Sequence, residues 1–180
     1  MQAQEIEAYL AQLGQELADR GVEQPVRMLL IGGVFMLTRV HNRLTTDDVD
    51  VFFKDIEDTT VSPLYQQCRA AIRAIANRNH LKSNWLNDIM GDSLRETGRV
   101  PPGTLWRVYD VLEVYLPPAE FILALKLMAG RQKDRADIFA LCQRLQIQDR
   151  QQAQRLVDLY IPDKQLQQLS DLDDTLDEFF

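Results

Sequence analysis

LLIGGVFMLTRVHNRLTTDDVDVFF, residues 29–53, is the stretch that decides the fold of this chain. An apolar run ends at Gly32-Gly33, a helix-like segment follows, and a second apolar run carries Asp48 and Asp50. Side chains two positions apart on a strand point to the same face, so both carboxylates are predicted to project side by side. Folding does not call for such a pair, whereas Mg²⁺ is held by one or two carboxylates together with substrate phosphates.

The pattern of apolar residues outside this stretch predicts the remaining elements. Residues 5–20 have the spacing of an amphipathic helix that ends at Gly21, and strands are expected over 26–31 and 49–53. Both strands are continuously apolar, so we expect them to be central and covered on both faces. Further helices are expected over about 34–40, 63–77, 119–130, 133–145 and 149–160, and residues 105–116 are expected to form a strand or a hairpin.

A small sheet in the N-terminal two-thirds followed by helices predicts an α+β fold. A chain of 180 residues is one domain, or one domain with a helical extension. We expect an α/β core over residues 1–116 and a C-terminal helical region, packed on that core, over 117–180. The acidic tail, residues 171–180, is expected to be a frayed or docking segment.

Charge and cysteine content narrow the function classes. The net charge is −7, but the last twenty residues alone carry −5, so the rest of the chain is nearly neutral. This argues against duplex binding through a broad basic face, while leaving room for a local basic site. The two cysteines are too few for a disulfide framework, which favours a cytoplasmic setting, and no apolar run is long enough to span a membrane.

The diglycine and the paired aspartates are each ambiguous alone. Two glycines after a buried strand let the backbone approach a ligand, and the helix start that follows favours phosphate, yet ordinary strand-to-helix turns use the same residues. An Asp-x-Asp strand is by itself a weak metal signal. Together, with Arg43 and Thr46 between them, they predict glycine N–H groups and arginine for phosphates and carboxylates for Mg²⁺.

A second group of charged residues begins at Lys126, which lies in an otherwise apolar helix where an uncompensated ammonium would be costly. Arg131 and Lys133 follow on the next turn. They are predicted to clamp a triphosphate, with Asp134 and Asp137 orienting the bases or contacting the metal site. The alternative is a lysine that extends to solvent and a solvated charged turn.

These residues resemble a known superfamily. Gly32-Gly33 followed by Asp48-Val49-Asp50 is similar to the signature of the DNA-polymerase-β-like nucleotidyltransferases. RLTTDDVDVFF resembles the Arg-x-Thr-x-Asp-Ile-Asp form of bacterial minimal nucleotidyltransferases and abortive-infection-type toxins, except that Arg43 lies one position early. Residues 115–141 resemble the Lys-x-x-Ala-x-Arg … Lys-Asp-x-x-Asp-Ile block of the same group, and the matching positions are Lys126, Arg131, Lys133, Asp134 and Asp137. The resemblance covers most of residues 26–141.

The resemblance implies a nucleotidyltransferase-type sheet and Mg²⁺-dependent transfer of a nucleotidyl group from an NTP to an RNA or protein acceptor, such as a tRNA end or a protein hydroxyl. A toxin–antitoxin setting with a cognate partner would follow from the same branch. The implied catalytic residues are Asp48, Asp50, Lys126 and Asp137. The implied nucleotide-binding residues are Gly32, Gly33, Arg43, Thr46, Arg131 and Lys133. The alternative is a catalytically inactive antitoxin or partner-binding module of the same fold.

Members of this superfamily commonly use a third carboxylate on a neighbouring strand. If residues 105–116 form one regular strand, Asp110 lies on its more apolar face and is the candidate metal ligand beside Asp48 and Asp50. Glu113 would then fall on the other face, where a surface ion pair explains it. The alternative for Asp110 is an ordinary hydrogen-bonded polar group.

Overall fold

The computed structural model describes residues 1–56 and 59–180, which form an α+β fold. The chain divides into two compact units, one of residues 1–92 and 103–116 and the other of residues 93–102 and 117–180. The predicted division at residue 116 differs from this only in residues 93–102, which belong to the second unit. Within the described residues, no helix is both long enough and apolar enough to span a membrane.

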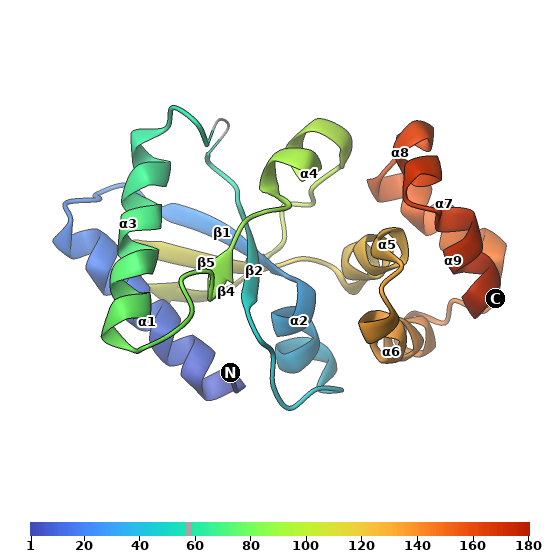
Figure 1. Cartoon of the computed structure of the whole chain (residues 1–180), viewed down its shortest axis with the longest axis horizontal. Helices are drawn as coiled ribbons and strands as arrows, with labels where there is room; N and C mark the ends of the chain where they lie inside the picture. Colours follow the sequence, from blue (N-terminus) through green and yellow to red (C-terminus); the bar gives the residue numbers. More distant parts are fainter. Residues whose placement is uncertain (57–58) are drawn as a thin grey trace. The chain divides into compact units, whose positions relative to one another are not determined.

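The first unit is built on a five-stranded mixed sheet in the order β3-β2-β1-β5-β4 (Figure 1). Its central strand pairs antiparallel with β2 and parallel with β5. The two apolar runs of the sequence therefore form the middle of the sheet, as predicted from their composition. The bounds are β1 Val26–Ile31, β2 Val49–Phe53, β3 Leu86–Asn87, β4 Thr104–Tyr109 and β5 Leu112–Leu116.

Two helices, α1 (Ala3–Asp19) and α3 (Pro63–Arg78), cover one face of this sheet. On that face Gly14 of α1 lies against Tyr109, and Tyr65 of α3 stacks edge-on against Phe53 of β2. The indole of Trp85 is buried beneath α3 and donates to the carbonyl of Ile72 over 3.1 Å. The α-helical spacing of apolar side chains in α1 thus produces the buried face of the sheet.

The opposite face of the sheet is more polar and carries the candidate site. Strand register places Arg27 opposite Glu113, and these two side chains form an ion pair over 3.1 Å. The hydroxyl of Tyr115 donates to the same carboxylate over 2.7 Å. This hydrogen bond, with the contribution of Arg27, lowers the pKa of Glu113.

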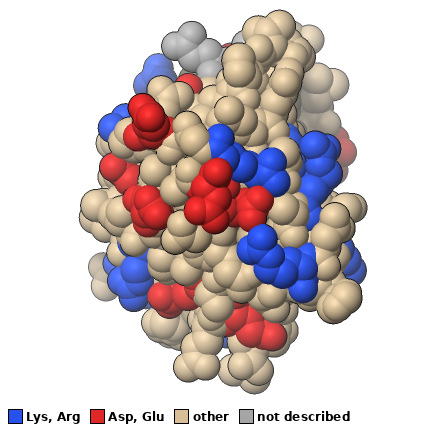
Figure 2. Space-filling view, turned by 90° about the vertical axis from the view of Figure 1, so that its left-hand side faces the viewer, with Lys and Arg blue, Asp and Glu red and all other residues tan. Residues whose placement is uncertain are grey.

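Acidic and basic side chains are interspersed on the face of the molecule shown in Figure 2, with neither sign forming a continuous surface. Several of the basic side chains of α1, α3 and β4 are paired with nearby acids. Glu16 contacts both Arg20 and Arg78 at 2.8 Å, and Glu7 contacts Arg107 at 3.2 Å. This face therefore lacks the single-sign field that steers duplex nucleic acid.

The second unit is helical. Its elements are α5 Ala119–Ala129, the short η2 Gln132–Asp134, α6 Arg135–Leu145, α7 Arg150–Tyr160, α8 Lys164–Leu169 and α9 Leu172–Phe179. Helix α4 (Gly91–Thr97), which crosses the division between the units, was not predicted. The strand β3 and the helices α8 and α9 were not predicted either.

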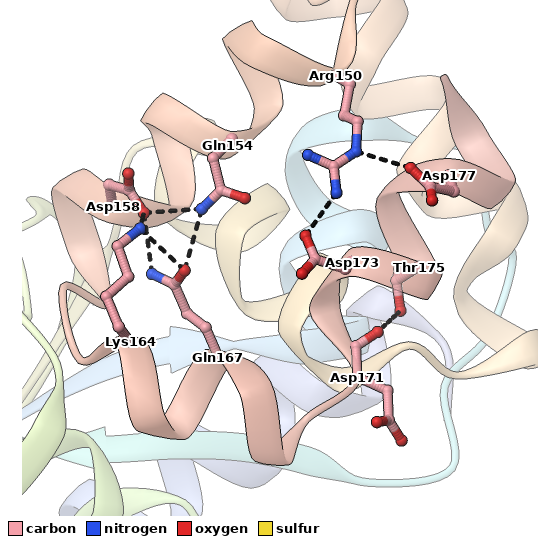
Figure 3. A network of polar contacts seen from close by, with 9 residues as sticks. All are labelled: Arg150, Gln154, Asp158, Lys164, Gln167, Asp171, Asp173, Thr175 and Asp177. Atoms are coloured by element: carbon pink, nitrogen blue, oxygen red, sulfur yellow. Dashed lines mark hydrogen bonds and ion pairs between the residues drawn. The ribbon is translucent and has the colours of Figure 1, made fainter.

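The acidic tail is a packed helix, so the expectation of a frayed segment is wrong, while a docking role stays a prediction. Leu172 and Leu176 of α9 are 2% and 0% exposed. Arg150 of α7 holds α9 through ion pairs with Asp173 and Asp177 (Figure 3). Lys164 and Gln167 of α8 bind Asp158 of α7, and Gln154 of α7 joins the same network (Figure 3). In α9 the helical spacing of apolar residues is enough to pack the helix, although most of its polar residues are acidic.

Burial predicts a loss of stability at alkaline pH. It raises the pKa of Tyr65 to about 12, with a hydrogen bond to Asp88 contributing, and raises the pKa of Cys68 to about 12. Each group ionises more easily in the unfolded chain than in the folded protein. Its contribution to the free energy of unfolding is therefore complete below the unfolded pKa, and it is lost as pH rises from about 9 toward 12. We expect the urea midpoint, followed by Trp85 fluorescence, to fall between pH 8 and pH 11.

The Tyr65→Phe variant isolates one of these groups, because it removes the ionising hydroxyl while keeping the ring against Phe53. Its midpoint should decline less steeply over the same pH range than that of the unaltered protein. An identical decline in both proteins would show that Tyr65 does not ionise differently in the folded and unfolded states.

Candidate functional site

The site forms where β1 ends and β2 begins. Antiparallel pairing places Asp50 opposite Ile31, the last residue of β1. The next residue, Gly32, has φ of 65° and starts the short helix α2 (Gly32–Phe35). The Asp50 carboxylate occupies the space where a side chain at Gly32 would lie, and a Cβ there would clash with its Oδ2 atom. Glycine is therefore required at this position both by conformation and by space.

The second glycine faces two of the predicted nucleotide-binding residues. A Cβ at Gly33 would clash with the hydroxyl of Thr46 and would lie 3.5 Å from Nη1 of Arg43. Thr46 is buried and is fixed by backbone hydrogen bonds with Met1, and its hydroxyl donates to the carbonyl of Asp48 over 3.2 Å. The loop between α2 and β2 thus folds back so that Arg43 and Thr46 reach the diglycine.

The helix after the diglycine is irregular. α2 continues directly into η1 (Met36–Val40), a π-helical segment that ends at His41, which has φ of 61°. The N–H of His41 bonds to the carbonyl of Met36 over 2.8 Å, which is the i to i−5 spacing of a π-helix. Such segments are rare and occur often at functional sites. At the other end, the first N–H groups of α2 have no acceptor within the helix.

Asp50 lies on the sheet face away from α1 and α3, and Asp48, the residue before β2, reaches the same face, because it contacts Asn87. Both are half-buried, while Val49 between them is buried on the face that α1 and α3 cover. Asn87 of β3 lies opposite Asp50 in the parallel ladder, and its amide Nδ2 donates to Oδ2 of Asp48 over 3.3 Å. Within the described part of the chain, the Asp48 carboxylate forms no ion pair.

This arrangement can bind a cation and an anion side by side. Two carboxylates are held on one face beside a helix start, and a guanidinium lies next to the second glycine. In residues 1–56 and 59–180 no group of three or more His, Cys, Asp and Glu side chains is placed to hold a metal ion. A cation here would therefore take two carboxylates from the protein and its remaining oxygens from elsewhere, which is how Mg²⁺ is usually bound.

Asp110 is not part of this site, so its prediction as a metal ligand is wrong. Residues 104–116 form a hairpin, in which Tyr109 of β4 pairs with Leu112 of β5 and Asp110 starts the two-residue turn with φ of 55°. The neighbouring Val111 accepts a hydrogen bond from Val26, at the start of β1. Gly32 follows the other end of β1, about 17 Å away by the rise of six strand residues.

The hairpin also changes which side chains share a face with Glu113. One regular strand over residues 105–116 would place Glu113 on the same face as Arg107 and Tyr109. The turn places Glu113 opposite Val108, so Glu113 lies away from Arg107 and Tyr109, which face α1. A surface ion pair does account for Glu113, as predicted, but its partner is Arg27.

Lys126 belongs to a buried ion triad in the second unit, and its assignment as a phosphate clamp stays a prediction. Its Nζ atom lies 2.7 Å from Asp134 Oδ1 and 2.7 Å from Asp137 Oδ2. The three side chains are 6%, 8% and 1% exposed, respectively. The ammonium therefore ties α5 to η2 and α6, and Asp137 is one of its two counter-ions, while a catalytic role of Asp137 stays a prediction. Arg131 and Lys133 are exposed after α5, and their role in binding nucleotide stays a prediction.

Asn87 is the site residue that sequence reasoning missed. A strand of two residues carries no detectable alternation, and an asparagine after a Trp-Leu pair is not a chemical motif. Two signals were available: the isolated Trp85, whose burial anchors the segment beside β2, and the resemblance of residues 85–88 to a segment of one bacterial branch of the nucleotidyltransferase superfamily.

Substitution of the glycines tests the close approach at the diglycine. Gly32→Ala adds a clash with Asp50 to an unfavourable φ, whereas Gly21→Ala adds only the unfavourable φ, because nothing lies within 4 Å of its Cβ. We expect Gly21→Ala to lower the free energy of unfolding by about 1 kcal/mol and Gly32→Ala by about 2–4 kcal/mol. Urea denaturation measures both, and equal losses would show that Asp50 does not press on Gly32.

Removal of the buried ammonium tests the triad. Lys126→Met leaves two uncompensated buried carboxylates and should lower the free energy of unfolding of the second unit by about 3–5 kcal/mol. The matched surface change, Arg150→Gln, should lower it by at most about 1 kcal/mol. Far-UV circular dichroism in urea follows both. A stable Lys126→Met protein with weakened NTP binding would instead support the phosphate-clamp assignment.

Comparisons of this chain with protein-family models, with curated proteins and with solved structures gave no match. The functional argument therefore depends on the chemistry of the site itself. Its elements are the two carboxylates on one sheet face, the glycine pair that they adjoin, and the guanidinium and hydroxyl of the intervening loop.

Proposed function

We propose that this protein is a Mg²⁺-dependent nucleotidyltransferase with its catalytic residues in the first unit. The observation that carries the proposal is the placement of Asp48 and Asp50 on one sheet face, with the Asp50 carboxylate against Gly32 at the start of a helix. That combination brings groups for a divalent cation and groups for phosphate within a few ångströms of each other. The resemblance of residues 29–53 to the polymerase-β-like signature supports the same assignment.

The donor set fits magnesium. Hard oxygen ligands suit Mg²⁺, which usually takes one or two protein carboxylates and keeps the remaining positions for water and phosphate. The only side-chain partner of Asp48 within the described chain is a neutral amide, so a cation would compensate its charge. Bound there, Mg²⁺ would neutralise the phosphates of an NTP and polarise the phosphorus that is attacked.

The other residues of the site would orient the nucleotide. Arg43 lies beside Gly33 and can donate to phosphate oxygens through two N–H groups at once. The N–H groups of the first turn of α2 would donate to phosphate oxygens. Rate acceleration would come from positioning and charge stabilisation, since phosphoryl transfer needs little covalent chemistry from the protein. The acceptor we propose is an RNA end or a protein hydroxyl.

One observation favours a second candidate, a nucleotide-dependent binding module without transferase activity that acts as the antitoxin or partner of another protein. Among the described residues of β5, those that share the face of Asp50 are Glu113 and Tyr115, and Glu113 is already paired with Arg27. The strand on the far side of β1 thus supplies no carboxylate to the pair. A site with fewer carboxylates would bind Mg²⁺ and NTP while transferring slowly or not at all.

Titration calorimetry with each NTP in the presence of Mg²⁺ tests the proposal. We expect the protein to bind NTP, and Asp48→Asn and Asp50→Asn each to weaken binding at least about tenfold, equivalent to about 1.4 kcal/mol. Asp47→Asn is the matched control, because Asp47 is exposed, adjacent in sequence and outside the site. Its affinity should equal that of the unaltered protein.

Incubation with labelled NTPs, total tRNA and lysate protein separates the two candidates. Label on RNA or protein that is lost in Asp48→Asn and kept in Asp47→Asn supports the transferase. NTP binding without any transfer supports the binding module. Absence of both NTP binding and transfer rules out a nucleotide site at the diglycine.

A further inference from the structure

Strand β3 has only two residues, so contacts outside the strand must hold it in the sheet. It is anchored by Trp85, which is 1% exposed, donates to the Ile72 carbonyl and accepts a backbone hydrogen bond from Val49 over 2.7 Å. The ladder then places Leu86 opposite Val49 and Asn87 opposite Asp50. An indole fixed in the core therefore sets the position of Asn87 directly beside the acidic strand.

Asn87 brings a buried amide to the two carboxylates. The residue is 7% exposed, and its Nδ2 donates to Asp48 Oδ2 over 3.3 Å. Its carbonyl Oδ1 accepts no hydrogen bond from the residues that the structure describes. The amide thus uses its nitrogen on Asp48, and its oxygen is available to a further partner.

The amide and carboxylate are spaced suitably for two ligands of one cation. Oxygens in neighbouring positions around an octahedral Mg²⁺ lie about 2.9 Å apart, given metal–oxygen distances of 2.0–2.1 Å. The separation of 3.3 Å between Asn87 Nδ2 and Asp48 Oδ2 is close to this. Rotation of the amide about its Cβ–Cγ bond exchanges the nitrogen and oxygen, so the same side chain holds Asp48 without a cation and offers Oδ1 when one is present.

We propose that the side-chain carbonyl of Asn87 is the third protein ligand of the divalent cation, beside the carboxylates of Asp48 and Asp50. This inference rests on the proposed function, because it assigns another residue to the same site. A neutral ligand in this place keeps the protein's contribution at two negative charges.

Manganese binding tests the inference without relying on activity. Mn²⁺ has the same oxygen preference and is followed by calorimetry and by loss of the free-ion electron paramagnetic resonance signal. We expect Asn87→Ala to weaken Mn²⁺ binding about 10–100-fold. Asn87→Asp should bind Mn²⁺ at least as tightly as the unaltered protein at pH 8, and its affinity should fall more steeply toward pH 5, because the added carboxyl must ionise beside two others.

The two Asn87 variants separate a ligand from a hydrogen-bond donor. Aspartate keeps an oxygen and loses the N–H, so an Asn87→Asp protein as weak as Asn87→Ala would overturn the inference, as would unchanged affinity in Asn87→Ala. Asn79→Ala is the control, because Asn79 bonds to Gln12 and Ile75 outside the site and should not alter Mn²⁺ affinity. Unchanged Trp85 fluorescence verifies the fold of each variant.

Failure of the proposed function gives a different result. If the unaltered protein and all three asparagine variants bind no Mn²⁺, the cation site itself is refuted, and the inference about Asn87 is refuted with it. If the unaltered protein and Asn87→Ala bind Mn²⁺ equally well and Asp48→Asn does not bind it, only the inference about Asn87 is overturned.

Discussion

The contact between the Asp50 carboxylate and the bare Cα of Gly32 is the constraint on which the site depends. It exists because β1 and β2 are antiparallel with Ile31 opposite Asp50, so the first residue after β1 must share space with an acidic side chain of β2. A side chain at Gly32 would push the carboxylate away, and a φ of 65° is unfavourable for other residues. The pairing register, the conformation of Gly32 and the position of Asp50 therefore depend on one another. At Gly33 the side chains of Thr46 and Arg43 lie close to where a Cβ atom would be.

Charge is balanced differently at the two ends of this sheet face. Near the start of β1, Glu113 receives a hydrogen bond from Tyr115 and an ion pair from Arg27, and its pKa is lowered as a result. Near the end of β1, Asp48 receives a neutral amide from Asn87. Two carboxylates two residues apart repel each other. A cation bound beside the glycines would offset this repulsion.

The sequence determined the parts of this site that depend on short-range pattern. Continuous apolar runs identified β1 and β2, and the two-residue period of a strand placed Asp48 and Asp50 on one face. Long-range geometry decided the rest. The turn at Asp110 reverses the chain and shifts the alternation of Glu113, which no periodicity within residues 105–116 reveals. Asn87 lies on a strand too short to show a pattern, and it reaches Asp48 only because Trp85 is fixed in the core.

Lys126 shows why a charged residue in an apolar helix is hard to interpret from sequence. Its counter-ions follow 8 and 11 residues later, across the turn between α5 and α6, so only the tertiary fold shows that they neutralise it. The same holds for other charges of the second unit, where Arg150 binds Asp173 and Asp177 and Arg135 binds Glu178. These cations are occupied in holding helices together, and a phosphate would have to displace a carboxylate to reach them. The physical argument for nucleotide binding therefore rests on the first unit, where the two carboxylates lie beside the glycines.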